Sequence, residues 1–127
     1  MIGPNVDYAQ GYLLGFSGVG THMAGQYDPA SGSRAVGKLD ITTVVRRLDD
    51  GVMFAANHSV GYFRDTGEVT IGAAGALAEP LLVGIASGID VSFVADGTNV
   101  QAIVTLGALA TGTYEAAVYF DGKGFFL

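Results

Sequence analysis

Apolar and polar residues alternate strictly along several stretches of the chain. In residues 39–47 one face of the pattern carries Leu39, Ile41, Thr43 and Val45. Residues 89–97 and 114–120 repeat the alternation. Because successive side chains of a strand point to opposite faces, this period of two predicts half-buried β-strands. Shorter runs of strand-forming residues predict further strands at 52–55, 60–63, 68–71, 81–85 and 100–106.

Turn signals separate these runs. Asp-Gly pairs occupy residues 50–51, 96–97 and 121–122, and Asp65-Thr66-Gly67 is a related sequence. Glycine takes positive φ without steric cost and aspartate tolerates it, so Asp-Gly between apolar runs predicts a β-hairpin. We therefore expect an all-β fold, either an antiparallel sandwich or a barrel of jelly-roll type, built of hairpins. Alternation assigns side chains to faces and leaves the strand order open.

The beginning of the chain lacks this regularity. Residues 8–16 are apolar and aromatic, and residues 21–37 are rich in Gly, Ser, Asp and Pro, as loops are. We expect an extended N-terminal arm and long loop over residues 1–37, with one early strand around 12–16. A single β-domain is expected over residues 38–127. An arm without a partner strand of its own would pack on a neighbouring subunit.

The sequence closes on three large apolar residues after the last Asp-Gly pair. A final hairpin at residues 121–122 would leave a short second arm that needs cover from its own sheet or from another chain. Consecutive strand residues point to opposite faces, so we expect one of Phe125 and Phe126 in the core and the other against a partner. The side chains expected to make contacts between subunits are Tyr8, Tyr12, Leu13, Leu14, Phe16, Phe125, Phe126 and Leu127.

Composition supports contact with a partner. Of the 127 residues 50% are hydrophobic and 14% are charged, against about 25% charged in an ordinary domain. So few charges suggest that part of the apolar surface meets another protein. The net charge of -6 and the total of 6 Lys and Arg argue against nucleic acid and against anionic membrane surfaces as partners.

Targeting and metal-binding signals are also missing from the sequence. The first ten residues have no basic region followed by an apolar core, so no secretory signal is expected. The apolar tract 71–89 is interrupted by Glu79-Pro80, which argues against a membrane span and leaves room for one or two helical turns before Pro80. The chain has no cysteine, and we expect neither a cofactor nor a metal site.

Catalytic signals are weak. His22 and His58 are the two side chains that titrate near neutral pH. A catalytic arrangement would need His58 to meet Ser59 and an aspartate such as Asp65, and no nucleophile motif surrounds them. We expect a protein that is not an enzyme.

Two resemblances add a functional expectation. Residues 105–127, with a Gly-Thr-Tyr lead-in, an apolar strand and an Asp-Gly turn, resemble a strand-turn-strand unit of concanavalin-A-like domains. In its short, acidic, cysteine-free and Ala/Gly/Val/Thr-rich character the chain resembles small capsid decoration (cement) proteins and other minor structural proteins of tailed bacteriophages.

The second resemblance implies a virion structural protein, most simply a capsid decoration protein that forms trimers or dimers. It would bind a major capsid protein or another structural protein on the capsid surface and stabilise the capsid, after assembly in the host cytoplasm. The alternative is a β-sandwich module of a phage fibre or surface protein that binds carbohydrates or a receptor. Its candidate contact residues are Tyr27, Tyr62 and Tyr119.

Overall fold

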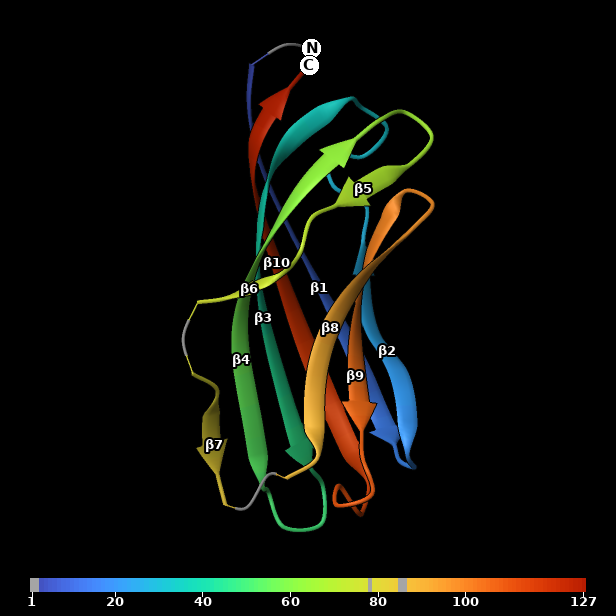
Figure 1. Ribbon diagram of the computed structural model, residues 1–127, viewed down its shortest axis with the longest axis vertical. Coiled ribbons are helices and arrows are strands. Elements are labelled where there is room, and N and C mark those ends of the chain that lie inside the picture. The colour runs from blue at the N-terminus through green and yellow to red at the C-terminus, as the bar shows by residue number, and fades with distance from the viewer. Residues whose placement is uncertain (1–2, 78, 85–86) are drawn as a thin grey trace.

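Two antiparallel β-sheets pack face to face in the computed structural model, which describes residues 3–77, 79–84 and 87–127 (Figure 1). The strands are β1 (Gly3–Phe16), β2 (Gly20–Tyr27), β3 (Ala35–Arg47), β4 (Met53–Arg64), β5 (Val69–Ile71), β6 (Gly75–Ala76), β7 (Leu81–Val83), β8 (Ile89–Asp96), β9 (Asn99–Leu106) and β10 (Tyr114–Phe126). The prediction of an all-β antiparallel sandwich is confirmed, and the two sheets do not close into a barrel.

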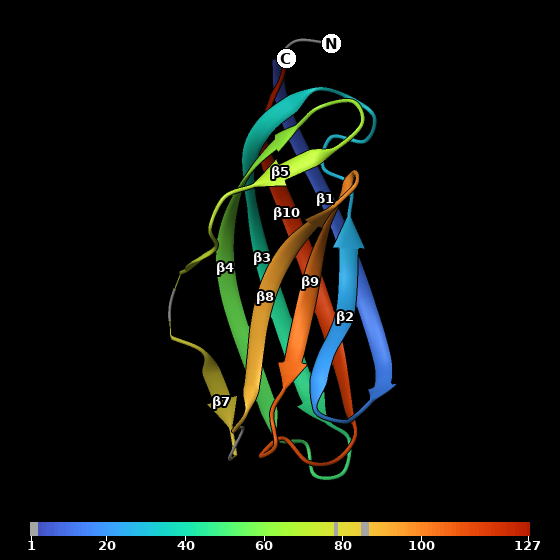
Figure 2. The ribbon, with the colours of Figure 1, turned by 45° about the vertical axis from the view of Figure 1, so that its right-hand side comes forward.

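The larger sheet, sheet A, has the strand order β1-β10-β3-β4-β5, and β6 and β7 also pair with β4. The smaller sheet, sheet B, has the order β2-β9-β8 and lies across sheet A (Figure 2). The pairing is nested, because β1 pairs with β10 and β2 pairs with β9. The chain thus wraps from one sheet to the other and back, in the manner of a jelly roll.

The core lies between the inner faces of the two sheets. The four residues that share a face in β3, Leu39, Ile41, Thr43 and Val45, are all at most 1% exposed. Alternate residues of β9 and β10 are buried in the same way, and Val91 of β8 closes the core from sheet B. The alternation read from the sequence therefore selected the buried face correctly in these strands.

Two glycines bring the sheets together along one side. A Cβ at Gly11 of β1 would lie 2.7 Å from the Gly25 Cα of β2, which is closer than real Cβ contacts come. Gly25 in turn lies under the Val118 and Phe120 side chains of β10. Because neither position has room for a side chain, β1 can cross close over β2 and hold its outward side chains at the edge of the sandwich.

Three of the four predicted hairpin turns are confirmed. Gly51 between β3 and β4 has a φ of 74°, and Gly97 between β8 and β9 has a φ of 58°. Asp65 and Glu68 exchange backbone hydrogen bonds of 2.8 and 3.3 Å in the turn between β4 and β5.

The fourth turn, at Asp121-Gly122, was a wrong prediction. Both residues lie inside β10, which pairs along its length with β1 on one side and β3 on the other. Gly122 is buried and packs at the Leu39 side chain, where a Cβ would lie 3.1 Å from the Leu39 Cδ2. The glycine makes room in the core here, so the strand-turn-strand likeness of residues 105–127 does not hold.

The interpretation of residues 1–37 as an arm and long loop also needs correction. This stretch contains the whole of β1 and β2, which pair with β10 and β9. The loop between β2 and β3 is short, covering residues 28–34, and it is tied to the end of β4 by an Asp28–Arg64 ion pair of 2.9 Å. Arg64 is 2% exposed, so this pair anchors the loop over the core.

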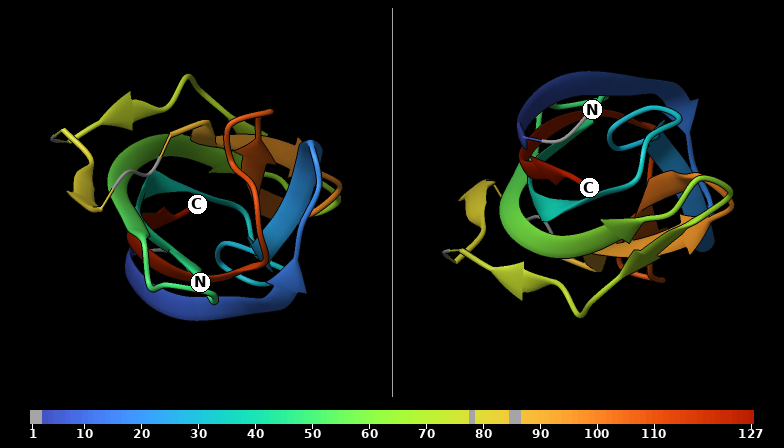
Figure 3. Two further views of the ribbon diagram at one scale, coloured as in Figure 1. Left: turned by 90° about the horizontal axis from the view of Figure 1, so that it is seen from below. Right: turned by 90° about the horizontal axis from the view of Figure 1, so that it is seen from above.

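Two further local predictions change. The runs 52–55 and 60–63 belong to one continuous strand, β4. The described part of residues 72–80 is extended instead of helical, and the strand expected at 81–85 is present as β7, with residue 85 outside the described residues. Figure 3 shows β6 and β7 standing away from the two layers of the sandwich.

Candidate functional site

The outer face of sheet A is formed by the side chains of β1, β10, β3 and β4 that point away from sheet B. The strand register arranges these residues in rows that cross the sheet. From the end near both termini the rows are Pro4-Phe125-Val36-Phe63, Val6-Lys123-Lys38-Gly61, Tyr8-Asp121-Asp40-Ser59, Gln10-Tyr119-Thr42-Asn57, Tyr12-Ala117-Val44-Ala55 and Leu14-Glu115-Arg46-Met53.

Strand β1 contributes an apolar edge to this face. Its outward side chains Val6, Tyr8, Tyr12 and Leu14 are 74%, 59%, 60% and 63% exposed. The inward positions of the same strand hold small or polar residues such as Asn5, and Leu13 packs against the core. An outward face that is more apolar than the inward face is the reverse of the usual pattern and marks an interaction surface.

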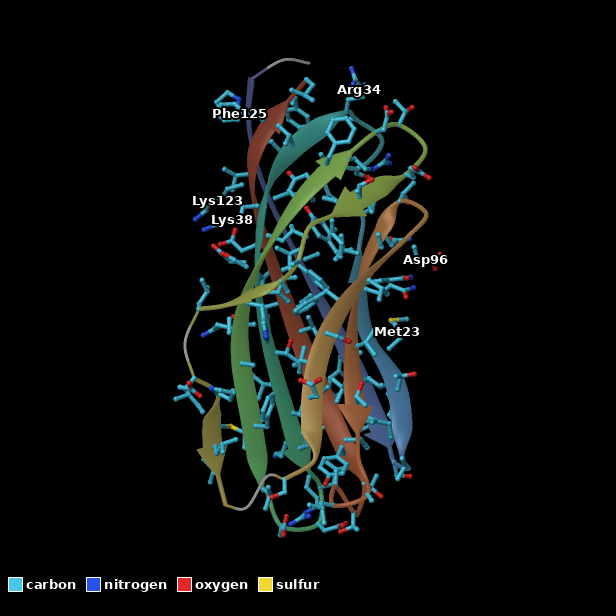
Figure 4. All side chains as sticks on the ribbon, in the orientation of Figure 1. Met23, Arg34, Lys38, Asp96, Lys123 and Phe125 are labelled. Atoms are coloured by element: carbon cyan, nitrogen blue, oxygen red, sulfur yellow. The ribbon has the colours of Figure 1, made fainter. Side chains whose placement is uncertain are left out.

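A band of four charged residues crosses the centre of the outer face. Lys38 lies opposite Lys123, and Asp40 lies opposite Asp121. Within each strand the lysine pairs with the aspartate, at 3.4 Å for Lys38–Asp40 and 3.8 Å for Lys123–Asp121. Figure 4 shows Lys38 and Lys123 side by side, with Phe125 nearer the termini and with Met23 and Asp96 on the other side of the sandwich.

Hydrogen bonding holds Asp40 in its ionised form. The Ser59 hydroxyl donates a hydrogen bond of 2.6 Å to the Asp40 carboxylate. This bond and the nearby Lys38 keep the pKa of Asp40 below its usual range, although partial burial opposes them.

A shallow groove, here called the Tyr12 groove, lies beside the charged band. It consists of two adjoining depressions of about 330 and 140 Å³, both lined by Tyr12 and Ala117. Gln10 and Tyr119 line one side, and Arg46 and Glu115 line the other. The small side chain of Ala117 forms part of the floor between these polar walls.

The polar groups of the Tyr12 groove are linked to one another. The Tyr12 hydroxyl and the Arg46 guanidinium both donate hydrogen bonds to the Glu115 carboxylate. The hydrogen bond from Tyr12 and then the one from Arg46 lower the pKa of Glu115, and the same hydrogen bond raises the pKa of Tyr12. Glu115 is thereby held as a carboxylate that Tyr12 and Arg46 orient.

A separate depression of about 430 Å³ lies on sheet A nearer the two termini. Val36, Phe63 and Ile71 are among its lining residues, and Gly61 leaves space because it lacks a side chain. The Arg34 guanidinium lies 5.9 Å from the centre of the Phe63 ring. This surface is largely apolar and offers few polar groups to a ligand.

The opposite edge of sheet A carries the β6–β7 segment, residues 72–77 and 79–84. All of these residues are exposed. The backbone of β7 pairs with Met53–Ala55 of β4. The large apolar side chains of the segment, each more than half exposed, are Leu77, Leu81, Leu82 and Val83. Sheet A therefore has exposed apolar side chains at both of its edges.

Most of the predicted contact residues lie on this outer face, and the rest pack inward. Those that are exposed are Tyr8, Tyr12, Leu14, Phe125 and Leu127, and those that pack in or against the core are Leu13, Phe16 and Phe126. Phe125 is 59% exposed on the outer face, whereas its neighbour Phe126 packs against the core. This division into outward and inward residues follows strand alternation. The interpretation of residues 8–16 as part of an arm did not predict it for β1. Val6 and the β6–β7 segment are also exposed, but they were not among the contact residues predicted from the sequence.

The three tyrosines proposed for carbohydrate contact do not share a surface. Tyr27 and Tyr62 are buried, and desolvation is the main cause that raises the pKa of each phenol. Tyr119 is exposed and lines the Tyr12 groove. Tyr12, which the sequence analysis assigned to subunit contacts, is the second tyrosine of that groove.

The residues considered for catalysis are not brought together. His58 points inward, where its ring lies 5.2 Å from the Phe93 ring, while Ser59 points outward to Asp40. Asp65 lies in the turn after β4 and pairs with Arg34 at 3.2 Å. His22 lies in β2, where Nε2 is 2.9 Å from the Gly18 carbonyl oxygen. His58 and Ser59 therefore face opposite sides of β4, and neither Asp65 nor His22 joins them.

Within residues 3–77, 79–84 and 87–127, no three His, Cys, Asp or Glu side chains gather in a way that could hold a metal ion. Likewise, no helix in these residues is long and apolar enough to cross a membrane.

Comparisons with known proteins show a likeness in fold. No protein-family model and no curated protein matches the sequence. The tailspike protein of Acinetobacter baumannii phage AM24 superposes with a TM-score of 0.53 over 97% of this chain and 26% of its own, at 14% identity. The tailspike protein of Acinetobacter phage vB_ApiP_P1 superposes with a TM-score of 0.51 over 93% of this chain and 22% of its own, at 16% identity. The chain thus spans about a quarter of the length of these tailspikes, and it is similar in fold to part of a phage structural protein.

Proposed function

We propose that this chain is a structural module of a bacteriophage particle that assembles with other copies of itself through sheet A. The observation that carries the proposal is the apolar outward side of β1, where Val6, Tyr8, Tyr12 and Leu14 are all more than half exposed. Four large apolar side chains on one side of an edge strand, interrupted only by Gln10, are typical of a surface that meets a partner. The similarity of the fold to two phage tailspike proteins supports a place on the virion.

Within the particle we favour the tail apparatus over the capsid surface. Both solved structures reported above are tailspikes, and each contains a region that this sandwich matches over nearly its whole length. Capsid decoration, with a major capsid protein as partner, is the alternative, and it rests on composition and size. Either location implies assembly in the host cytoplasm together with other virion proteins.

Immunogold electron microscopy of the phage that encodes the chain tests this assignment. Antibodies against the folded module should label the tail tip, and mass spectrometry of purified virions should detect the chain. Gold particles spread over the capsid would support decoration instead. Absence of the chain from purified virions would overturn the proposal as a whole.

A receptor-binding role is the second candidate, and the Tyr12 groove is the observation that favours it. Its two tyrosines present flat apolar rings with polar tips, and Gln10, Arg46 and Glu115 supply hydrogen-bonding groups around a shallow floor. Such a combination suits a carbohydrate, which offers apolar ring faces and many hydroxyl groups.

A matched pair of variants tests the receptor-binding role. Tyr119→Ala removes a ring that lines the groove, whereas Tyr8→Ala removes an exposed tyrosine of the same face outside it. If the groove binds oligosaccharides, a calorimetric screen should find a ligand whose affinity falls at least tenfold in the first variant and is unchanged in the second. Equal losses in both variants would exclude the groove as the site.

We assign the module no catalytic activity. His58, Ser59 and Asp65 face different surroundings, so they offer no nucleophile with a base beside it. A hydrolytic assay against surface polysaccharides tests this assignment. Activity that His58→Ala abolishes would overturn it.

A further inference from the structure

We propose that the β6–β7 segment of one copy docks against the β1 edge of the next copy, so that the copies close into a ring around an axis parallel to the strands. The proposal rests on the self-assembly proposed above and names the two surfaces that meet. It starts from the fact that β1 and β7 lie at opposite edges of the same sheet.

The two apolar edges lie at the same level of the sheet. The register places Tyr12 in one row with Ala117, Val44, Ala55 and, beyond them, Leu81 of β7. The next row begins with Leu14 and continues through Glu115, Arg46 and Met53 to Val83. Thus the same two rows end in large exposed apolar side chains at both edges.

This match in level favours a ring over a filament. Two different surfaces that meet form a heterologous contact, which closes into a ring or continues as a filament. A filament needs a displacement along the axis in addition to the rotation. Because Tyr12 and Leu14 lie in the same rows as Leu81 and Val83, a rotation about an axis parallel to the strands brings the edges together without displacement. A contact of this kind closes into a ring when the rotation is a whole fraction of a full turn.

The chemistry of the two edges fits a second copy of the chain. The outward residues of β1 carry no charge, and within the described part of the β6–β7 segment Glu79 is the sole charged residue. Contact between these edges would therefore bury little charge. The β7 side chains are exposed on both faces of that strand, so the strand has room for a neighbour beside it.

The size of the surface also suits a contact between folded subunits. The four exposed apolar side chains of β1 offer roughly 400 Å². A standard interface needs about 800 Å² on each partner. The side chains alone thus supply about half of that area, and the backbone edge and neighbouring rows can supply the rest.

Engineered cysteines test the contact directly, because the natural chain has none. Leu14→Cys and Val83→Cys are introduced singly and together, and the proteins are oxidised and run on non-reducing gels. The double variant should form covalent oligomers, and a mixture of the two single variants should form covalent dimers. Each single variant alone should stay monomeric on the gel.

A matched control comes from sheet B. Thr21 and Asp90 lie at its opposite edges in a single row with Thr105, and both are exposed. The double variant Thr21→Cys/Asp90→Cys should not form covalent oligomers. Light scattering on the unmodified protein gives the number of copies and shows that assembly does not depend on the cysteines.

Three results would overturn the ring. A covalent dimer from either single variant would show a contact between like edges. A second double variant, Tyr12→Cys/Val83→Cys, is shifted by one row. If the protein assembles but neither this pair nor the Leu14/Val83 pair cross-links, the contact lies elsewhere. A protein that is monomeric at micromolar concentration would exclude it. Each of these results leaves the detection of the chain in virions, which tests the proposed function, as a separate measurement.

Discussion

The outer faces of the two sheets differ in kind. Sheet A presents aromatic and aliphatic side chains along β1 and in the row nearest the termini. Its charged residues lie on the two central strands, β10 and β3. Sheet B, all of whose strand residues the structure describes, presents mainly Ser, Thr, Gln and Asp on its outer face. Its large exposed apolar side chains are Met23 and Val94.

This difference separates a surface that is stable in water from one that is suited to a partner. Single exposed apolar residues such as Val94 are normal on any protein. A row of four large apolar side chains on an edge strand, as on β1, favours association unless it is covered. The two sheets share a core, and they differ in what their outward residues can contact.

The largest expected effect is on association. Leu14→Lys places an ammonium group beside Glu115, so the fold should survive, but it puts a charge into the proposed contact. We expect self-association to weaken about 100-fold, which corresponds to about 3 kcal/mol and is typical of a central contact residue. Val94→Lys, on sheet B near Asp96, is the matched control and should change nothing. Sedimentation equilibrium measures both, and equal effects would remove the distinction between the faces.

The next effect concerns the inner and outer sides of sheet A. Gly11→Ala introduces a Cβ 2.7 Å from the Gly25 Cα, whereas a Cβ at Gly61 meets no atom within 4 Å. We expect Gly11→Ala to lower the free energy of unfolding by up to about 3 kcal/mol, as overpacking does. Gly61→Ala should change it by less than about 1 kcal/mol. Urea denaturation compares them, and similar values would contradict the close approach of β1 and β2.

The two terminal phenylalanines compare the faces within one strand. Phe126→Ala removes a partly buried ring from the core and should cost about 2 kcal/mol of folding free energy, less than the 3–5 kcal/mol of a fully buried ring. Phe125→Ala removes an exposed ring and should cost less than about 0.5 kcal/mol. Thermal denaturation ranks the two variants. The reverse order would show that the assignment of faces in β10 is wrong.

The smallest expected effect is a dependence on acid. The pKa of Glu115 in the folded protein lies below the ordinary glutamate value of 4.5, so its contribution to stability is present above about pH 4.5 and is lost as pH falls through the folded pKa. Glu115→Gln should flatten the fall in melting temperature below that pH, and Tyr12→Phe, which removes the main hydrogen bond, should flatten it partly. An unchanged acid limb in both variants would show that the Tyr12–Glu115–Arg46 group does not contribute.

Much of the fold could be predicted because alternation and simple turns are local properties. The buried face of β3 and the turns at Gly51 and Gly97 depend on residues close in sequence. The same local reading failed at Asp121-Gly122, because a strand paired on both sides overrides a turn signal. It failed for residues 1–37 because the partners of β1 and β2 lie about a hundred residues and some eighty residues away in sequence.

The candidate site shows the same division. The amino-acid sequence shows that charged residues are few and that the neighbours Phe125 and Phe126 of a strand must face opposite ways, because the direction of a side chain in a strand is a local property. Which side of β1 faces outward follows from the tertiary structure, because it depends on the pairing of β1 with β10 and on the contact between Gly11 and Gly25. The placement of Tyr12 beside Glu115 and of Leu14 in one row with Val83 likewise depends on pairing between strands far apart in the chain.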